Sequence, residues 1–233
     1  GYGEELQSGA RGAVSEVGCW MLDLKGLSPP ERLKALREQV PRLWQMDSQV
    51  VQDYWARALA WAAGELGDKG ALGPLNTLAR GPWRSEELDC EVLLALHKIG
   101  LDDPMARELV AYFWKHPWPG PTPDGWAASY DIAMEMTVEA DLQKASDEEA
   151  GRYLVRLLRT NLDLARKAYY WLQEQGRHQA EPVRRAMVFT ISEPYADTRA
   201  AAHAAQWLEW ADLEVLLPLV RAQWREEATR TLG

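Results

Sequence analysis

Residues 59–68 read LAWAAGELGD, a run of apolar and small residues that ends in Gly67 and Asp68. An echo follows 33 residues later, where residues 92–100 read VLLALHKIG. In both places a glycine follows the apolar run, and a glycine at that position commonly ends a helix. A period of about 33 to 45 residues with two helices in each unit is typical of α-solenoids. The sequence therefore predicts stacked helical repeats.

Helix signals continue along most of the chain. Ser28, two prolines and Glu31 form a helix start, and apolar residues at helical spacing continue that helix to Leu43. Residues 204–208 and 216–219 echo the first motif more weakly. Strand-like alternation is absent, and apolar residues at helical spacing predict further helices over residues 50–66, 71–80, 85–99, 104–115, 126–145, 147–160, 162–175, 181–191, 197–211 and 213–231.

Short linkers rich in Gly, Asp and Pro separate these segments, so neighbouring helices must pack antiparallel. The pattern resembles HEAT-like repeats. We predict an all-α fold, a right-handed α-solenoid of about five to six HEAT-like two-helix repeats with a concave groove. Residues 1–233 are expected to form a single domain. The proline-rich stretch 116–126 is expected to be a semi-rigid surface loop.

The charge of the chain is unevenly distributed. The net charge is −9, but residues 1–150 hold 14 Lys and Arg against 25 Asp and Glu, a balance of −11, whereas residues 151–233 hold 12 against 10, a balance of +2. The total alone argues against nucleic acid as a partner. A cationic surface must therefore come mainly from the last third of the chain.

Several classes of site are not indicated. Cys19 and Cys90 are far apart, with no His or Cys at metal-ligand spacing, so we expect two buried thiols, no disulfide and no metal. There is no apolar run of membrane-spanning length, no glycine-rich phosphate loop and no nucleophile elbow. The chain is expected to be a cytoplasmic monomer without a cofactor. Four tryptophans at periodic apolar positions are expected in the core, namely Trp44, Trp55, Trp61 and Trp171.

Three side chains from successive repeats are candidates for a common groove. Asp131 and Arg166 are 35 residues apart, and Arg166 and Trp207 are 41 apart. Residues one repeat apart occupy equivalent places on adjacent helices of a solenoid. A carboxylate, a guanidinium and an indole would thus line one groove. Trp207 is equally compatible with a place in the core.

The segments that hold these residues resemble the HEAT-like alkylpurine DNA glycosylases. The stretch GWAASYD (residues 125–131) resembles the tryptophan-bearing helix start that carries their catalytic aspartate, and NLDLAR (161–166) resembles the helix whose arginine faces the lesion. Residues 204–208 resemble the helix that supplies their second aromatic side chain. The chain departs from the family at Ala127, where relatives usually have a second tryptophan, and residues 45–125 are longer by roughly one repeat.

This resemblance implies a monofunctional DNA glycosylase that hydrolyses the N-glycosidic bond of alkylated, cationic N3 or N7 purines in double-stranded DNA. Asp131 would stabilise the positive charge that develops on the sugar and would orient water. Arg166 would hold phosphate by bidentate hydrogen bonds, and Trp126 and Trp207 would pack against the deoxyribose. The groove would grip the backbone and leave the base stacked, so bulky adducts would be accepted as well as simple methyl groups.

A group of basic residues favours the same interface. Arginines recur at helical spacing ahead of Arg166 and again at the start of the next repeat, where they would follow a phosphate backbone. The predicted DNA-binding group is Arg152, Arg156, Arg159, Lys167, Arg184 and Arg185. An ordinary solvated helix face would show the same stripe.

Two alternatives stay open. One is a non-catalytic helical scaffold whose acidic first part binds a basic protein through exposed aromatic residues such as Trp118 and Trp126. The other is a relative that binds DNA but no longer cleaves it, and the missing second tryptophan at Ala127 is the main argument for it.

Overall fold

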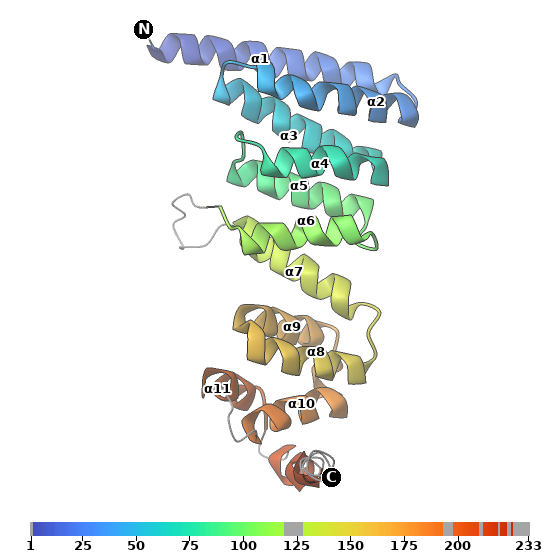
Figure 1. Cartoon of the computed structure of the whole chain (residues 1–233), viewed down its shortest axis with the longest axis vertical. Coiled ribbons are helices and arrows are strands. Elements are labelled where there is room, and N and C mark those ends of the chain that lie inside the picture. Colours follow the sequence, from blue (N-terminus) through green and yellow to red (C-terminus); the bar gives the residue numbers. More distant parts are fainter. Residues whose placement is uncertain are drawn as a thin grey trace. The chain divides into compact units, whose positions relative to one another are not determined.

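The computed structural model describes residues 2–118, 128–192, 198–209, 212–218, 220–222 and 225. Within these residues all regular secondary structure is helical, which confirms the predicted all-α fold. The elements are α1 (Tyr2–Lys25), α2 (Pro29–Gln39), η1 (Val40–Gln45), α3 (Gln49–Leu66), η2 (Lys69–Ala71), α4 (Leu72–Arg80), α5 (Glu86–Ile99), α6 (Pro104–Lys115), α7 (Ala128–Leu142), α8 (Asp147–Thr160), α9 (Leu162–Glu174), η3 (Arg177–Gln179), α10 (Glu181–Ser192) and α11 (Thr198–Gln206) (Figure 1).

The chain divides into two compact units, Gly1–Thr137 and Val138–Gly233. The boundary falls inside α7, so one continuous helix contributes residues to both units. Each unit is described separately below. A single repeat domain over the whole chain stays a prediction.

Most helix boundaries lie within two residues of their predicted positions because capping residues fix them. The Ser48 hydroxyl accepts a hydrogen bond from the backbone N–H of Val51 at the start of α3. The end of α3 is set by Gly67, whose φ of 63° is the left-handed conformation that glycine adopts without strain. At the start of α8 the backbone N–H of Ser146 donates to the Glu149 carboxylate, which completes a capping box and lowers the pKa of Glu149.

Two features of the first unit were not predicted. The 24-residue helix α1 carries four glycines and a weak apolar pattern, so its sequence gives little helix signal. Tertiary packing supports it, because Ala13, Val17 and Leu24 are buried and the Trp20 ring contacts the edge of Trp55. The helix predicted to run to residue 43 instead ends at Gln39 and continues as the 3-10 helix η1, which contains Pro41.

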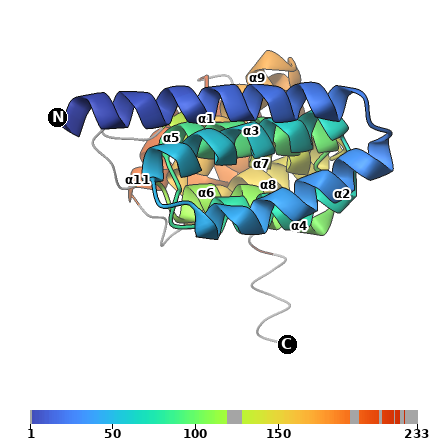
Figure 2. The same cartoon turned by 90° about the horizontal axis from the view of Figure 1, so that it is seen from above.

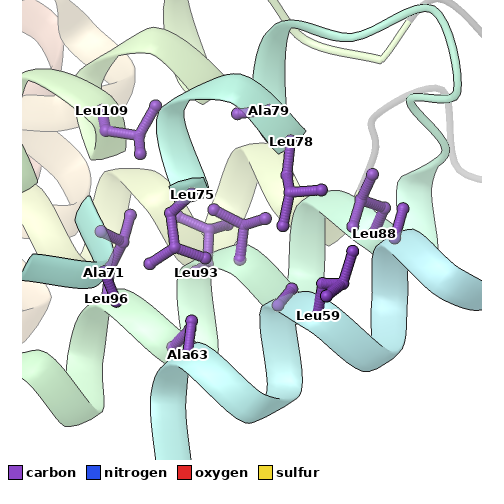
Figure 3. Close-up of a cluster of buried hydrophobic side chains, with 14 of the residues drawn as sticks. Leu59, Ala63, Ala71, Leu75, Leu78, Ala79, Leu88, Leu93, Leu96 and Leu109 are labelled. Atoms are coloured by element: carbon purple, nitrogen blue, oxygen red, sulfur yellow. The ribbon is translucent and has the colours of Figure 1, made fainter. Parts of the chain in front are cut away.

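Small residues control how closely the helices of the first unit approach. Figure 2 shows α1, α3 and α5 on one side of this unit and α2, α4 and α6 on the other. A Cβ atom at Gly64 of α3 would lie 2.9 Å from the Cα of Ala95 on α5. Leucines fill the space between these helices and α4, as Figure 3 shows for Leu59, Leu75 and Leu93.

Polar contacts of the first unit join residues that are 33 positions apart. The Lys98 ammonium lies 2.5 Å from a Glu65 carboxylate oxygen, and the Lys69 ammonium lies 2.8 Å from Asp102. The Arg37 guanidinium donates to the carbonyl oxygen of Gly70. The spacing of the sequence echo is therefore also the spacing of contacts in the structure.

The second unit is organised around α8. This helix packs against α10 and α9, and α11 packs against α10. A Cβ atom at Gly151 would lie 2.6 Å from the carbonyl oxygen of Pro182, so a glycine is required where α8 meets the start of α10. Leu154, Leu158 and Val183 fill the interior of this unit.

The predicted burial of three side chains, Trp44, Trp61 and Cys19, was wrong. Trp55 is buried as predicted, but Trp44 is 63% exposed and Trp61 is 43% exposed, since apolar periodicity does not show how far a helix edge is covered. Cys19 is exposed rather than buried. Cys90 is half-buried among carboxylates, and its burial, followed by those negative charges, raises its pKa to about 11.

Replacing Gly64 tests the close approach of α3 and α5. We expect Gly64→Ala to lower the free energy of unfolding by about 1–3 kcal/mol, because the added methyl group meets backbone atoms that cannot rotate away. Gly73→Ala is the matched control, since a Cβ atom at this helical position meets nothing within 4 Å. Urea unfolding followed by circular dichroism measures both. Equal stability of the two variants would contradict this account of the packing.

Candidate nucleic-acid interface

Asp131 lies in the first turn of α7, and its side chain is exposed. The start of this helix is held by Glu86 of α5, whose carboxylate accepts a hydrogen bond from the backbone N–H of Ala128 at 2.5 Å. The aspartate is therefore presented at the surface from a helix end that another helix holds in place. Trp126, the aromatic residue predicted to act beside it, lies outside the described residues.

Arg166 lies on α9 and is also exposed. Asn161 caps this helix by accepting a hydrogen bond from the backbone N–H of Leu164 at 3.1 Å, which explains the asparagine of the NLDLAR motif. The Arg166 guanidinium lies 3.9 Å from the Asp163 carboxylate, and both side chains are about half exposed. A pair this exposed contributes little to stability, so the guanidinium is available to exchange it for a phosphate.

Trp207 follows α11 directly and stacks on a tyrosine of α9. The centres of the Trp207 and Tyr169 rings lie 4.3 Å apart, with 3° between the ring planes. Tyr169 is one helical turn after Arg166, so an aromatic stack and an exposed guanidinium occupy neighbouring positions of the second unit. Sequence reasoning selected Trp207 but missed Tyr169 and the exposed Tyr170. An aromatic pair three and four positions after the arginine was the available signal.

The predicted three-residue groove is not tested by this arrangement. The stack of Trp207 on Tyr169 brings the end of α11 against the helix of Arg166. Asp131 belongs to the first unit and Arg166 to the second. The meeting of all three side chains therefore stays a prediction.

The predicted DNA-binding residues separate into distinct locations. Arg152, Arg159 and Arg185 line a pocket of about 260 Å³ between α8 and α10. Arg156 lies outside it, with its guanidinium carbon 5.1 Å from the centre of the Tyr153 ring. Lys167 is half-buried on α9 and, like Arg166, does not line the pocket. The α8–α10 pocket is thus distinct from the surface that carries Arg166.

Arg184 does not fit its predicted role in DNA binding. Its side chain is 13% exposed and forms an ion pair with Asp212, whose side chain is 10% exposed. Asp212 also accepts a hydrogen bond from the backbone N–H of Glu209 at 2.7 Å. Burial raises the pKa of the neighbouring Tyr169, while the positive charge of Arg184 opposes that shift. Arg184 is therefore held inside the unit by Asp212 and is poorly placed to contact phosphate.

The described part of the chain shows no clustered metal ligands and no helix suited to cross a membrane. There, no three side chains of the His, Cys, Asp or Glu type are grouped so that they could hold a metal ion. None of the described helices combines the length and apolar character needed to cross a membrane.

Separate substitutions of Arg184 and Arg185, which are adjacent on α10, distinguish a buried structural role from an exposed surface position. We expect Arg184→Ala to lower the free energy of unfolding by about 3–5 kcal/mol, because it leaves the Asp212 carboxylate buried without its cation. Arg185→Ala should cost about 1 kcal/mol or less, since its carboxylate partners are half exposed. Thermal and urea unfolding followed by circular dichroism measure this difference, and similar losses for both variants would refute it.

Comparison with known proteins identifies no family for this chain: no family model, no curated protein and no solved structure matches it. The resemblance to alkylpurine glycosylases therefore depends on the residues of this chain and on their arrangement alone.

Proposed function

We propose that the chain is a right-handed α-solenoid of HEAT-like repeats that acts as a DNA glycosylase, hydrolysing the N-glycosidic bond of alkylated purines in double-stranded DNA. The observation that carries this proposal is the stack of Trp207 on Tyr169, one helical turn from the exposed Arg166. The contacts at 33-residue spacing in the first unit support the repeat architecture. The concave groove of the solenoid would hold the DNA.

The residue types suit the chemistry of the reaction. Loss of a cationic base builds positive charge on the deoxyribose, and a carboxylate placed near that sugar stabilises it. Asp131 would supply the carboxylate and orient the attacking water. Arg166 would hold a backbone phosphate near the lesion. The face of Trp207 would attract the cationic nucleoside, with Tyr169 keeping its ring in a fixed plane.

A second candidate function is a non-catalytic scaffold that binds a basic protein. Two observations favour it. Trp44 and Trp61 are large aromatic side chains left exposed in the first unit, and such residues often anchor protein interfaces. Residues 1–150 carry a charge of −11, from 14 basic and 25 acidic residues, which would attract a cationic partner.

Asp131→Asn tests the glycosylase proposal. We expect the release of alkylated bases from methylated duplex DNA to fall by at least about 100-fold, because a neutral amide cannot stabilise the cationic sugar. Binding to the same duplex, measured by fluorescence anisotropy at low salt, should remain close to that of the unchanged protein. Asp163→Asn, which removes an exposed carboxylate of α9, is the matched control and should retain activity.

The outcomes separate the competing functions. Equal base release by Asp131→Asn and the unchanged protein would exclude Asp131 as the catalytic carboxylate. Duplex binding without any base release would identify a DNA-binding protein that does not cleave. Failure to bind duplex DNA at low salt, together with retention of a basic protein, would favour the scaffold.

A further inference from the structure

The α8–α10 pocket concentrates positive charge in a small volume. Three guanidinium groups line it, from Arg152, Arg159 and Arg185, together with one carboxylate, that of Glu148. Lone arginines on a helix surface are common, but three beside a single lining carboxylate give one pocket an excess of positive charge. The composition of the lining therefore indicates an anionic occupant.

The shape of the pocket is fixed by the helix packing beneath it. Gly151 allows α8 to reach the backbone of Pro182, because any Cβ atom there would lie 2.6 Å from the Pro182 carbonyl oxygen. Both residues line the pocket, so its position follows from the closest approach of the two helices. A volume of about 260 Å³ is below the usual range of drug-sized ligand sites. The pocket fits a compact group.

The arginines are held in place by contacts that an anion can supplement or replace. The Arg159 guanidinium carbon lies 5.5 Å from the centre of the Phe189 ring, an arrangement typical of a cation–π contact. The Arg185 guanidinium nitrogens lie 3.0 Å from a carboxylate oxygen of Glu181 and 3.6 Å from one of Glu148. Both carboxylates are about half exposed, so these ion pairs are weak and exchange for a stronger acceptor at small cost.

We propose that the α8–α10 pocket is a binding site for a single phosphate group. Guanidinium groups bind phosphate through paired, charge-assisted hydrogen bonds. Two or three of them around one volume suit a phosphate ligand better than a carboxylate ligand, which would need only one. Phe189 and Val155 give the pocket an apolar side on which a small organic group attached to the phosphate can rest. The site is separate from the surface of Arg166 and does not depend on the glycosylase proposal.

Two sources can supply this phosphate, a small phosphorylated molecule or the backbone of a nucleic acid. The test begins with isothermal titration calorimetry of the full chain against inorganic phosphate and against a 5′-mononucleotide. We expect one saturable site. Arg152→Gln should weaken binding by about tenfold, because it removes one charge-assisted contact from an exposed side chain of the lining.

Arg156→Gln is the matched control. Arg156 lies one turn from Arg152 on the same helix, but it contacts Tyr153 and does not line the pocket. Its substitution should leave phosphate binding unchanged. Equal affinity of the two variants, or the absence of a saturable site in the unchanged protein, would overturn the proposal.

Glu148→Gln provides a test in the opposite direction. Glu148 is the carboxylate of the lining and competes with phosphate for Arg185. Its neutralisation should tighten phosphate binding by about threefold. A purely structural role for these residues would give no gain, and weaker binding by this variant would count against the proposal.

A short unmodified duplex distinguishes the two sources. If the backbone is the occupant, inorganic phosphate should compete with the duplex and Arg152→Gln should weaken binding of both. If the occupant is a small molecule, Arg152→Gln should weaken binding of the mononucleotide and leave duplex binding unchanged. Either result supports a phosphate site. Loss of base release on Asp131→Asn is measured separately, so failure of one proposal leaves the other standing.

Discussion

The close approach of paired helices at small residues is the constraint on which both units depend. Gly64 lets α3 lie against the backbone of Ala95, and Gly151 lets α8 lie against the backbone of Pro182. At such a distance the large side chains must point to the flanks of the contact, where they bury apolar area between neighbouring helices. In the second unit the same contact borders the α8–α10 pocket, since Gly151 and Pro182 line it together with the three arginines. The close helix contact and the candidate anion site therefore share Gly151 and Pro182.

Helix order and helix ends were largely predictable because local residues determine them. Serine and asparagine caps, together with glycine stops, act within one turn, and the sequence displays them directly. Helix α1 was missed for the opposite reason. Its stability comes from burial against α3, including the contact of Trp20 with Trp55, and no local signal reports such packing. The exposed Trp44 shows the same limit, since periodicity locates an apolar face but not the extent of its cover.

The candidate site was predictable by position along the chain and not by orientation. Repeat spacing put Arg166 and Trp207 into one predicted groove, and that groove stays a prediction. The stack of Trp207 on Tyr169 was not predicted. Arg184 and Arg185 are adjacent in sequence, yet successive residues of a helix point about 100° apart. One arginine is therefore buried against Asp212 while the other lines the α8–α10 pocket. Charge counts along a sequence cannot separate these two outcomes, because they do not include the rotation of the helix.

A chain of net charge −9 can still offer a local site for phosphate. At physiological ionic strength, exposed charges farther apart than about 8 Å are largely screened from one another. An anion in the α8–α10 pocket is therefore governed by nearby side chains, which are the three arginines of the lining against Glu148 in the lining and Glu181 beside Arg185. The acidic residues of the chain oppose the approach of a large polyanion mainly at low salt, where screening is weak. Raising the salt concentration should reduce the repulsion from distant acidic residues, while the lining of the pocket keeps its local attraction. Binding of a single phosphate should therefore depend less on salt than binding of duplex DNA does.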